Sequence, residues 1–309
     1  MSLLQAKYLA QHDTIKAELC KGTIVKSNDQ FNNASAFGYD IRRDFYQEPL
    51  QKIYNFLTAK NLTPYNRFLA ANYFFKAGQI REMIATKYLV KYNFKMAEKI
   101  LSDNSDLQAA GHIDTLKNLH ADPFIIHIND CHDCDYKAPK EKTYNKKTFA
   151  QRMLELKKLA ETDTANRAKY YFLLANGYYN ITFFGNSWKA VAYDRAFPGW
   201  VFKTDTTEPK QYYDCSIAKE YYVKAMNAAK DKEFAARCCF MASKCEQNEF
   251  YVKAYDYKML THNPQKYFEI KNGYRNFFRT LENKYSDTKY YQQVIEECKY
   301  FDEFVKKIK

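Results

Sequence analysis

The chain has few of the residues that make tight turns. Only 8 Gly and 7 Pro are spread over 309 residues, which is too few for a β-sandwich or barrel with many short strands. No apolar run approaches the roughly 20 residues that a transmembrane helix needs. The 8 cysteines do not have the spacing of a disulfide framework, which a chain of this length does not need. We therefore expect a globular fold without a transmembrane segment or a disulfide scaffold.

Aromatic residues and lysine are abundant. With 28 Tyr and 23 Phe, aromatic content reaches 17%. Tyrosine combines packing area with a polar tip, which suits the half-buried layers of stacked helix pairs and also sugar-binding surfaces. The net charge of +12 comes mainly from lysine. The lysine ammonium is a point charge and lacks the planar guanidinium with which arginine recognises bases and phosphates. We interpret the charge as a solvated surface and do not expect nucleic acid as a partner.

Apolar residues recur at helical spacing in the second half of the chain. Over residues 166–181, one helical face carries Tyr170, Leu174, Gly177, Tyr178 and Ile181. Gly185 and Asn186 interrupt this pattern, and Ser187 is predicted to cap a second helix. The pattern therefore predicts a pair of antiparallel helices joined by a short turn, an αα-hairpin.

The same arrangement recurs further along. A helix is predicted over 215–229, and Asp231 is predicted to cap the next one, whose apolar stripe holds Phe234, Cys238, Met241 and Cys245. A turn is predicted near 247–249. Residues 254–258 then echo residues 218–222 at a spacing of 36. A period in the mid-thirties is typical of tandem two-helix solenoids.

The remaining predicted helices are less regular. They span 3–19, 43–60, 67–77, 80–92, 264–283 and 288–308, with Gly78 in the turn of the N-terminal hairpin. The segment of about 120–145 has no helical periodicity. We therefore predict an N-terminal helical region over 1–120, an irregular junction over 121–146 and helical repeats over 147–309.

Small residues at the expected helix contacts resemble those of tetratricopeptide (TPR) repeats in degenerate form. They are Ala71, Gly177, Ala218, Ala242 and Ala254; the Trp and closing Pro of the repeat consensus are mostly missing. The stretches HINDCHDCD, FAARCCFMASKCEQNEF and DTKYYQQVIEEC also resemble the C-terminal part of large, uncharacterised bacterial helical-repeat proteins. The resemblance covers the last two-thirds of the chain. It implies an all-α fold of αα-hairpins stacked as a right-handed TPR-like superhelix, and it implies no established activity.

A Cys-x-x-Cys pair lies in the irregular junction. Cys131 and Cys134 can chelate one metal ion, and His127 and His132 can complete a tetrahedral zinc site. The alternatives are a disulfide between the two cysteines, or a loop in which Asp and Asn side chains cap neighbouring backbone groups. We favour the disulfide or the hydrogen-bonded loop over a metal site. If a metal ion is bound, we predict zinc.

Two further groups of side chains require interpretation. Cys238 and Cys245 lie on an apolar stripe, where free cysteine packs as a small hydrophobe, so we predict that they lie in the core. The candidate groove residues are Tyr179, Phe183 and Asn186, which lie off the stripe of their helix, together with Trp188.

No catalytic motif is present: the sequence has no P-loop, GxGxxG, HExxH or GxSxG pattern. We therefore predict that the chain is not an enzyme but a scaffold that binds a protein or peptide. The alternatives are a glycan-binding helical module that uses exposed aromatic residues, and a metal-binding module at the Cys131/Cys134 loop. Residues 1–4 lack the features of a signal peptide, and we interpret them as an expression leader joined to an internal segment, so we make no prediction of the compartment.

Overall fold

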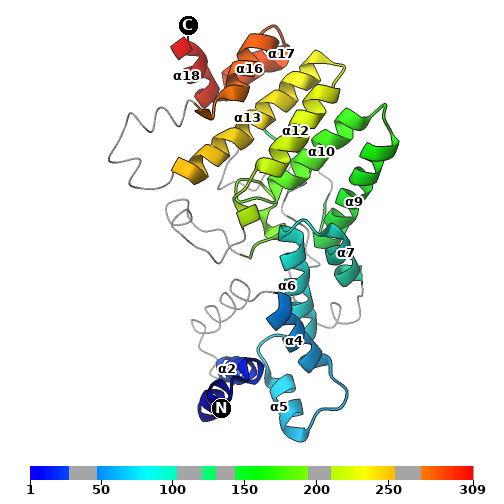
Figure 1. Cartoon of the computed structure of the whole chain (residues 1–309), viewed down its shortest axis with the longest axis vertical. Helices are drawn as coiled ribbons and strands as arrows, with labels where there is room; N and C mark the ends of the chain where they lie inside the picture. The colour runs from blue at the N-terminus through cyan, green and yellow to red at the C-terminus, as the bar shows by residue number, and fades with distance from the viewer. Residues whose placement is uncertain are drawn as a thin grey trace. The chain divides into compact units, whose positions relative to one another are not determined.

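The computed structural model describes residues 1–27, 47–102, 119, 121–129, 143–193, 210–254 and 273–308. Every regular element in these residues is a helix (Figure 1), which confirms the all-α prediction. None of the described helices is both long and apolar enough to cross a membrane. The chain divides into two compact units, one of Met1–Asn118 with Asn145–Lys147, and one of Leu119–Tyr144 with Thr148–Lys309.

The N-terminal unit consists of short helices. In chain order they are α1 (Ser2–Ala10), α2 (Thr14–Ser27), α4 (Gln47–Thr58), α5 (Pro64–Asn72), α6 (Ala77–Val90) and α7 (Phe94–Ser102). Helix α1 packs against α2, and α6 packs against both α4 and α7. The single helix predicted over 3–19 is wrong, because His12 at φ 58° breaks it. Gly78 lies in the first turn of α6 rather than between two helices.

A buried ion pair also lies in this unit. Lys146 is 3% exposed and Glu82 is 2% exposed, and the ammonium of Lys146 contacts the Glu82 carboxylate directly. Lys146 also donates to the hydroxyl of Thr86 at 2.9 Å. A charge this deeply buried is tolerated only when it is paired and hydrogen-bonded, as both charges are here.

The C-terminal unit is a row of helices. Apart from the first two residues of α9, it contains α9 (Lys146–Thr162), α10 (Arg167–Asn180), α12 (Ser216–Ala228), α13 (Lys232–Ala254), α16 (Asn276–Tyr285), α17 (Lys289–Glu297) and α18 (Lys299–Ile308). Helix α10 packs on α12, α12 on α13, and α13 on α16 and α17. Figure 1 shows α10, α12 and α13 lying side by side in chain order.

Side chains of the expected types hold this row together. An added Cβ on Gly177 would lie 2.5 Å from the sulfur of Met153, so the glycine allows α9 and α10 to approach closely. The predicted cap of α13 is confirmed, since the Asp231 carboxylate accepts from the backbone N–H of Phe234 at 3.0 Å. The predicted apolar stripe is confirmed too, because Cys238, Met241 and Cys245 are each 0% exposed.

One predicted turn and one predicted helix are wrong. Helix α13 continues through 247–249 to Ala254, because the polar side chains there find partners on neighbouring helices: Asn248 donates to the Tyr179 hydroxyl at 3.1 Å, and Glu249 pairs with Lys219. The second helix expected after Ser187 is only a 3₁₀ turn, Trp188–Ala190, and Ser187 does not cap it.

The C-terminal helix predicted over 288–308 is interrupted once. Cys298, at φ −107° and ψ 93°, separates α17 from α18. Tyr291, Val294 and Phe301 are buried, at 5%, 0% and 0% exposure. The repeat echo at 254–258 and most of the helix predicted over 264–283 lie outside the described residues.

Candidate functional site

A stretch of chain with a turn at residues 122–125, residues 121–129, lies against the helices of the C-terminal unit; we call it the clamped segment. It forms no helix or strand. Side chains from distant parts of the sequence donate hydrogen bonds to its backbone carbonyls. Asn176 donates to the carbonyl of Phe124 at 2.7 Å, and Asn180 donates to the carbonyls of Pro123 and Ile125 at 2.9 and 2.8 Å.

The same contact pattern continues toward both ends of the clamped segment. In the turn after α10, the Ser187 hydroxyl donates to the Ala121 carbonyl at 3.2 Å, and the Asn186 amide donates to the Asp122 carbonyl at 3.4 Å. At the other end, the Lys244 ammonium of α13 donates to the carbonyls of residues 127 and 128 at 2.9 and 3.3 Å. All these acceptors are main-chain carbonyl oxygens, so the contacts hold the segment by its backbone.

Other parts of the unit donate hydrogen bonds to the side-chain oxygens of the two asparagines of α10 and so orient their amides. Asn176 and Asn180 are four residues apart, so they lie on one face of the helix; they are 1% and 3% exposed. The Asn176 carbonyl oxygen accepts from the Tyr222 hydroxyl of α12 at 2.8 Å. The Asn180 carbonyl oxygen accepts from the backbone N–H of Asn186 at 3.4 Å. Each amide therefore presents its N–H groups toward the clamped segment.

Lys244 is positioned by aromatic rings. Its ammonium lies 5.7 Å from the ring centroid of Tyr179 and 6.0 Å from that of Phe240. A cation over an aromatic face is attracted by the ring quadrupole. These contacts hold the ammonium where it can donate to two successive carbonyls.

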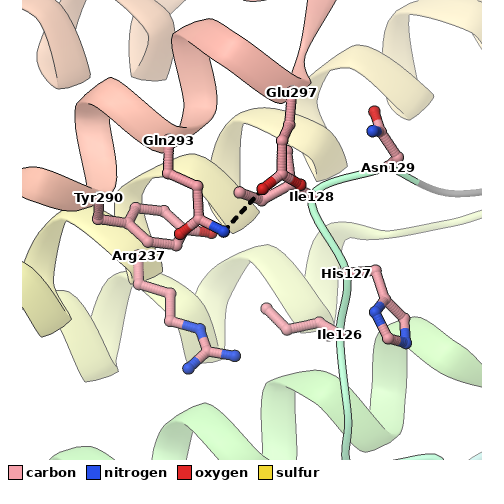
Figure 2. A pocket seen from close by; sticks show the side chains of 8 residues that line it. All are labelled: Ile126, His127, Ile128, Asn129, Arg237, Tyr290, Gln293 and Glu297. Atoms are coloured by element: carbon pink, nitrogen blue, oxygen red, sulfur yellow. Dashed lines mark hydrogen bonds between the residues drawn. The ribbon is translucent and has the colours of Figure 1, made fainter. Parts of the chain in front are cut away.

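One pocket lies beside the C-terminal end of the clamped segment, and we call it the polar pocket. It has a volume of about 480 Å³ and is lined by residues 126–129 together with Arg237, Tyr290, Gln293 and Glu297. Figure 2 shows Gln293 and Glu297 extending from α17 and Arg237 from α13, with the clamped segment running past them. The Gln293 amide donates to the Glu297 carboxylate at 2.8 Å. Burial raises the pKa of Tyr290 further above its usual value of 10.0.

A second pocket lies beside the N-terminal half of the clamped segment, and we call it the apolar pocket. Its volume is about 620 Å³, and its lining includes Phe124 and Ile125 of the clamped segment, Phe172 and Leu173 of α10, and Phe234 of α13. Arg237 lines both pockets. Both pockets border the clamped segment and have the volume of typical ligand sites, and we refer to the two together as the groove.

The groove predicted from the aromatic segment is wrong for two of its residues. Tyr179 and Phe183 are 1% and 2% exposed, so they belong to the core. The Tyr179 hydroxyl accepts the hydrogen bond from Asn248 described above. Phe183 packs edge to face on Tyr212, with 6.0 Å between ring centroids. Asn186 is half-buried and contacts the clamped segment. Trp188 is half-buried as well.

The predicted metal ligands are only partly within the described residues. His127 belongs to the clamped segment and lines the polar pocket. Cys131, His132 and Cys134 lie outside the described residues. In the part of the chain that the structure describes, no three His, Cys, Asp or Glu side chains converge on a metal-sized site. Zinc at this loop therefore stays a prediction.

Cys238 and Cys245 lie in the core, as predicted, and so does the neighbouring Cys239. Cys238, Cys239 and Cys245 are each 0% exposed. Burial raises the pKa of Cys239 to about 12 and also raises the pKa values of Cys238 and Cys245. Thiols with such high pKa values are rarely ionised and therefore poor nucleophiles and poor metal ligands at neutral pH.

Sequence reasoning missed the residues that contact the clamped segment most directly, Asn176, Asn180 and Lys244. One signal was available: two asparagines at i and i+4 inside an otherwise apolar helix require buried hydrogen-bond partners. Their partners were not readable, because the clamped segment lies more than 50 residues away in the sequence. Comparisons with profiles of known protein families, with curated proteins and with solved structures found no match.

Proposed function

We propose that the C-terminal unit is a non-catalytic scaffold that binds an extended segment of a partner protein in the groove beside the clamped segment. In this proposal the helices of 147–309 stack as a TPR-like solenoid. The observation that carries it is the capture of the clamped segment through its main-chain carbonyls by Asn176, Asn180 and Lys244. The clamped segment fixes one wall of the two pockets, which are what a partner polypeptide can occupy.

The way in which main-chain contacts and side-chain pockets combine in peptide recognition supports this proposal. Hydrogen bonds to the main chain give affinity without sequence preference, and pockets for side chains give specificity. The clamped segment occupies the main-chain donors, while the polar and apolar pockets beside it have volumes of about 480 and 620 Å³. A partner that lies along the clamped segment can fill both pockets with its side chains.

The geometry of the described tryptophan favours a peptide over a glycan. Sugar binding needs an indole face that is open to solvent. Trp188 is only half-exposed, and the ammonium of Lys189 lies 5.4 Å from its ring centroid. A sugar ring approaching this face has to displace the lysine.

A displayed library of random peptides tests the proposal on the full-length chain. Peptides of about ten residues are suitable, because such a peptide spans about 33 Å when extended. Selected peptides are then measured by fluorescence anisotropy against a variant in which both pockets are filled, Gln293→Trp with Ala228→Trp. Both residues are exposed and line the pockets. We expect the filled variant to lose at least about tenfold in affinity.

The matched control fills neither pocket. It carries Gln292→Trp and Asn227→Trp, which place the same side chains at exposed neighbouring positions on the same two helices. We expect this control to bind as the unmodified chain does. If no peptide is selected, or if the filled variant and the control bind equally, the groove is not a peptide site and the proposal is wrong.

A further inference from the structure

The apolar pocket has an ordered aromatic floor. Phe172 is 5% exposed, and its ring packs edge to face on Phe234 at 5.2 Å and on Tyr222 at 5.7 Å between centroids. Leu173 and Ile125 contribute further apolar wall and are half-buried. An aromatic guest in this pocket meets ring edges and faces that are already held in place, so it loses little free energy to ordering the site.

The rim of the same pocket is positively charged. Lys169, Lys230 and Arg237 line it and are exposed. None of these cations makes a salt bridge with the residues that the structure describes. The guanidinium carbon of Arg237 lies over the Phe172 ring, 5.2 Å from its centroid. An aromatic guest on this part of the floor therefore meets the guanidinium as well as the ring.

The acidic residue at the rim does not neutralise these cations. Asp231 is the carboxylate that lines the pocket, and its oxygens accept from the backbone N–H groups of Glu233 and Phe234 at 3.3 and 3.0 Å. Its charge is directed toward the N-terminus of α13, where it is favourable. The rim therefore keeps an excess of positive charge around an apolar floor.

We propose that the apolar pocket is the specificity subsite of the groove and that it takes an aromatic side chain flanked by acidic residues in an extended partner peptide. The ring lies on the Phe172–Phe234 floor, and the flanking carboxylates meet Lys169, Lys230 and Arg237. Two features favour this occupant: the charge complementarity of the rim and the continuity of the pocket with the clamped segment. This inference rests on the proposed function, since it names the class of peptide that the scaffold selects.

Three synthetic peptides test the chemistry. Each has about ten residues: one with a central Trp flanked by Asp and Glu, one with Trp flanked by Lys, and one with Ala in place of Trp between the same acids. Anisotropy is measured on the full-length chain at low and high salt. We expect the acidic aromatic peptide to bind at least about tenfold more tightly than either of the others, and its affinity to fall with salt.

Two single variants, each with a matched control, place the binding. Ala228→Trp fills the apolar pocket from its rim, whereas Asn227→Trp puts the same side chain outside it. Lys169→Glu reverses a rim charge, whereas Lys158→Glu reverses an exposed charge on α9 outside the pocket. We expect each pocket variant to weaken the acidic aromatic peptide by about tenfold or more, and each control to leave its affinity unchanged.

The outcomes separate this inference from the proposed function. If the acidic aromatic peptide binds but Ala228→Trp and Asn227→Trp affect it equally, the subsite is wrong and peptide binding stands. The same holds if library-selected peptides of another composition bind while the acidic aromatic peptide does not. If no peptide of either origin binds, both the subsite and the scaffold are overturned.

Discussion

Replacing Asn180 by Ala removes the side chain that donates to two carbonyls of the clamped segment. The amide is 3% exposed, and its bonds to the carbonyls of Pro123 and Ile125 measure 2.9 and 2.8 Å. Each bond contributes about 1 kcal/mol net, and an acceptor left buried without a donor costs about 1–3 kcal/mol. We expect the free energy of unfolding to fall by about 2–4 kcal/mol, allowing for partial access of water to the Ile125 carbonyl.

A second substitution at the same position sharpens the prediction. Asn180→Asp keeps the size of the side chain but turns carboxylate oxygens toward carbonyl oxygens, so both donors are replaced by a buried charge without a partner. We expect the order of stability to be Asn, then Ala, then Asp. The exposed Asn227 on α12 provides the control, and Asn227→Ala should change the free energy of unfolding by less than about 0.5 kcal/mol.

Two measurements check this reasoning. Urea unfolding followed by circular dichroism gives the free energies, and about 2–4 kcal/mol corresponds to roughly 4–16 °C in melting temperature for a unit of this size. Hydrogen exchange over residues 121–129 reports whether the clamped segment has been released, and we expect its protection to fall in Asn180→Ala. Equal stability of Asn180→Ala and Asn227→Ala, with unchanged exchange, would refute the role assigned to Asn180.

Three further predictions concern buried polar and apolar groups. Met241 is 0% exposed, so Met241→Asp buries an unpaired charge at a cost of several kcal/mol. We expect insoluble protein or a much lower melting temperature. An unchanged melting temperature would contradict the inward-facing apolar stripe of α13. Lys146→Met leaves the buried Glu82 carboxylate without its counter-charge and should lower the free energy of unfolding by about 3–5 kcal/mol. Adding Glu82→Leu to this variant should restore most of the loss. If the effects of the two substitutions in urea unfolding are additive, the pairing is contradicted. Burial raises the pKa of Glu246 above its usual 4.5. The folded state therefore holds this proton more tightly, and stability relative to Glu246→Gln should fall as pH rises from 4.5 through the raised pKa; a pH-independent difference would contradict this.

The sequence by itself determined the class of fold and much of its core. Apolar side chains at helical spacing predicted α10, α12 and α13, and Asp231 predicted where α13 begins. These features depend on neighbours three or four residues away, which is the range over which a helix acts on its own sequence. The burial of Cys238 and Cys245 followed from the same periodicity.

The candidate site was decided by the tertiary structure. Residues 247–249 have the polar composition of a turn, yet they stay helical because Asn248 and Glu249 find partners on α10 and α12. Tyr179 lies off the apolar stripe of α10 and Phe183 lies in the turn after it, yet both are buried because other parts of the unit cover them. Local pattern gives the direction of a side chain on its own helix and not what packs against that direction.

The clamped segment shows this division most clearly. Asn180 and Ile125 are 55 residues apart in the chain, and Lys244 and His127 are 117 apart. Periodicity contains no information on such pairs, since a polar side chain that faces a distant backbone has the same local pattern as one that faces water. The sequence thus predicted most of the described helices. Only their packing decided that two asparagines and a lysine meet the clamped segment, because the donors and acceptors of that contact come together only when the chain is folded.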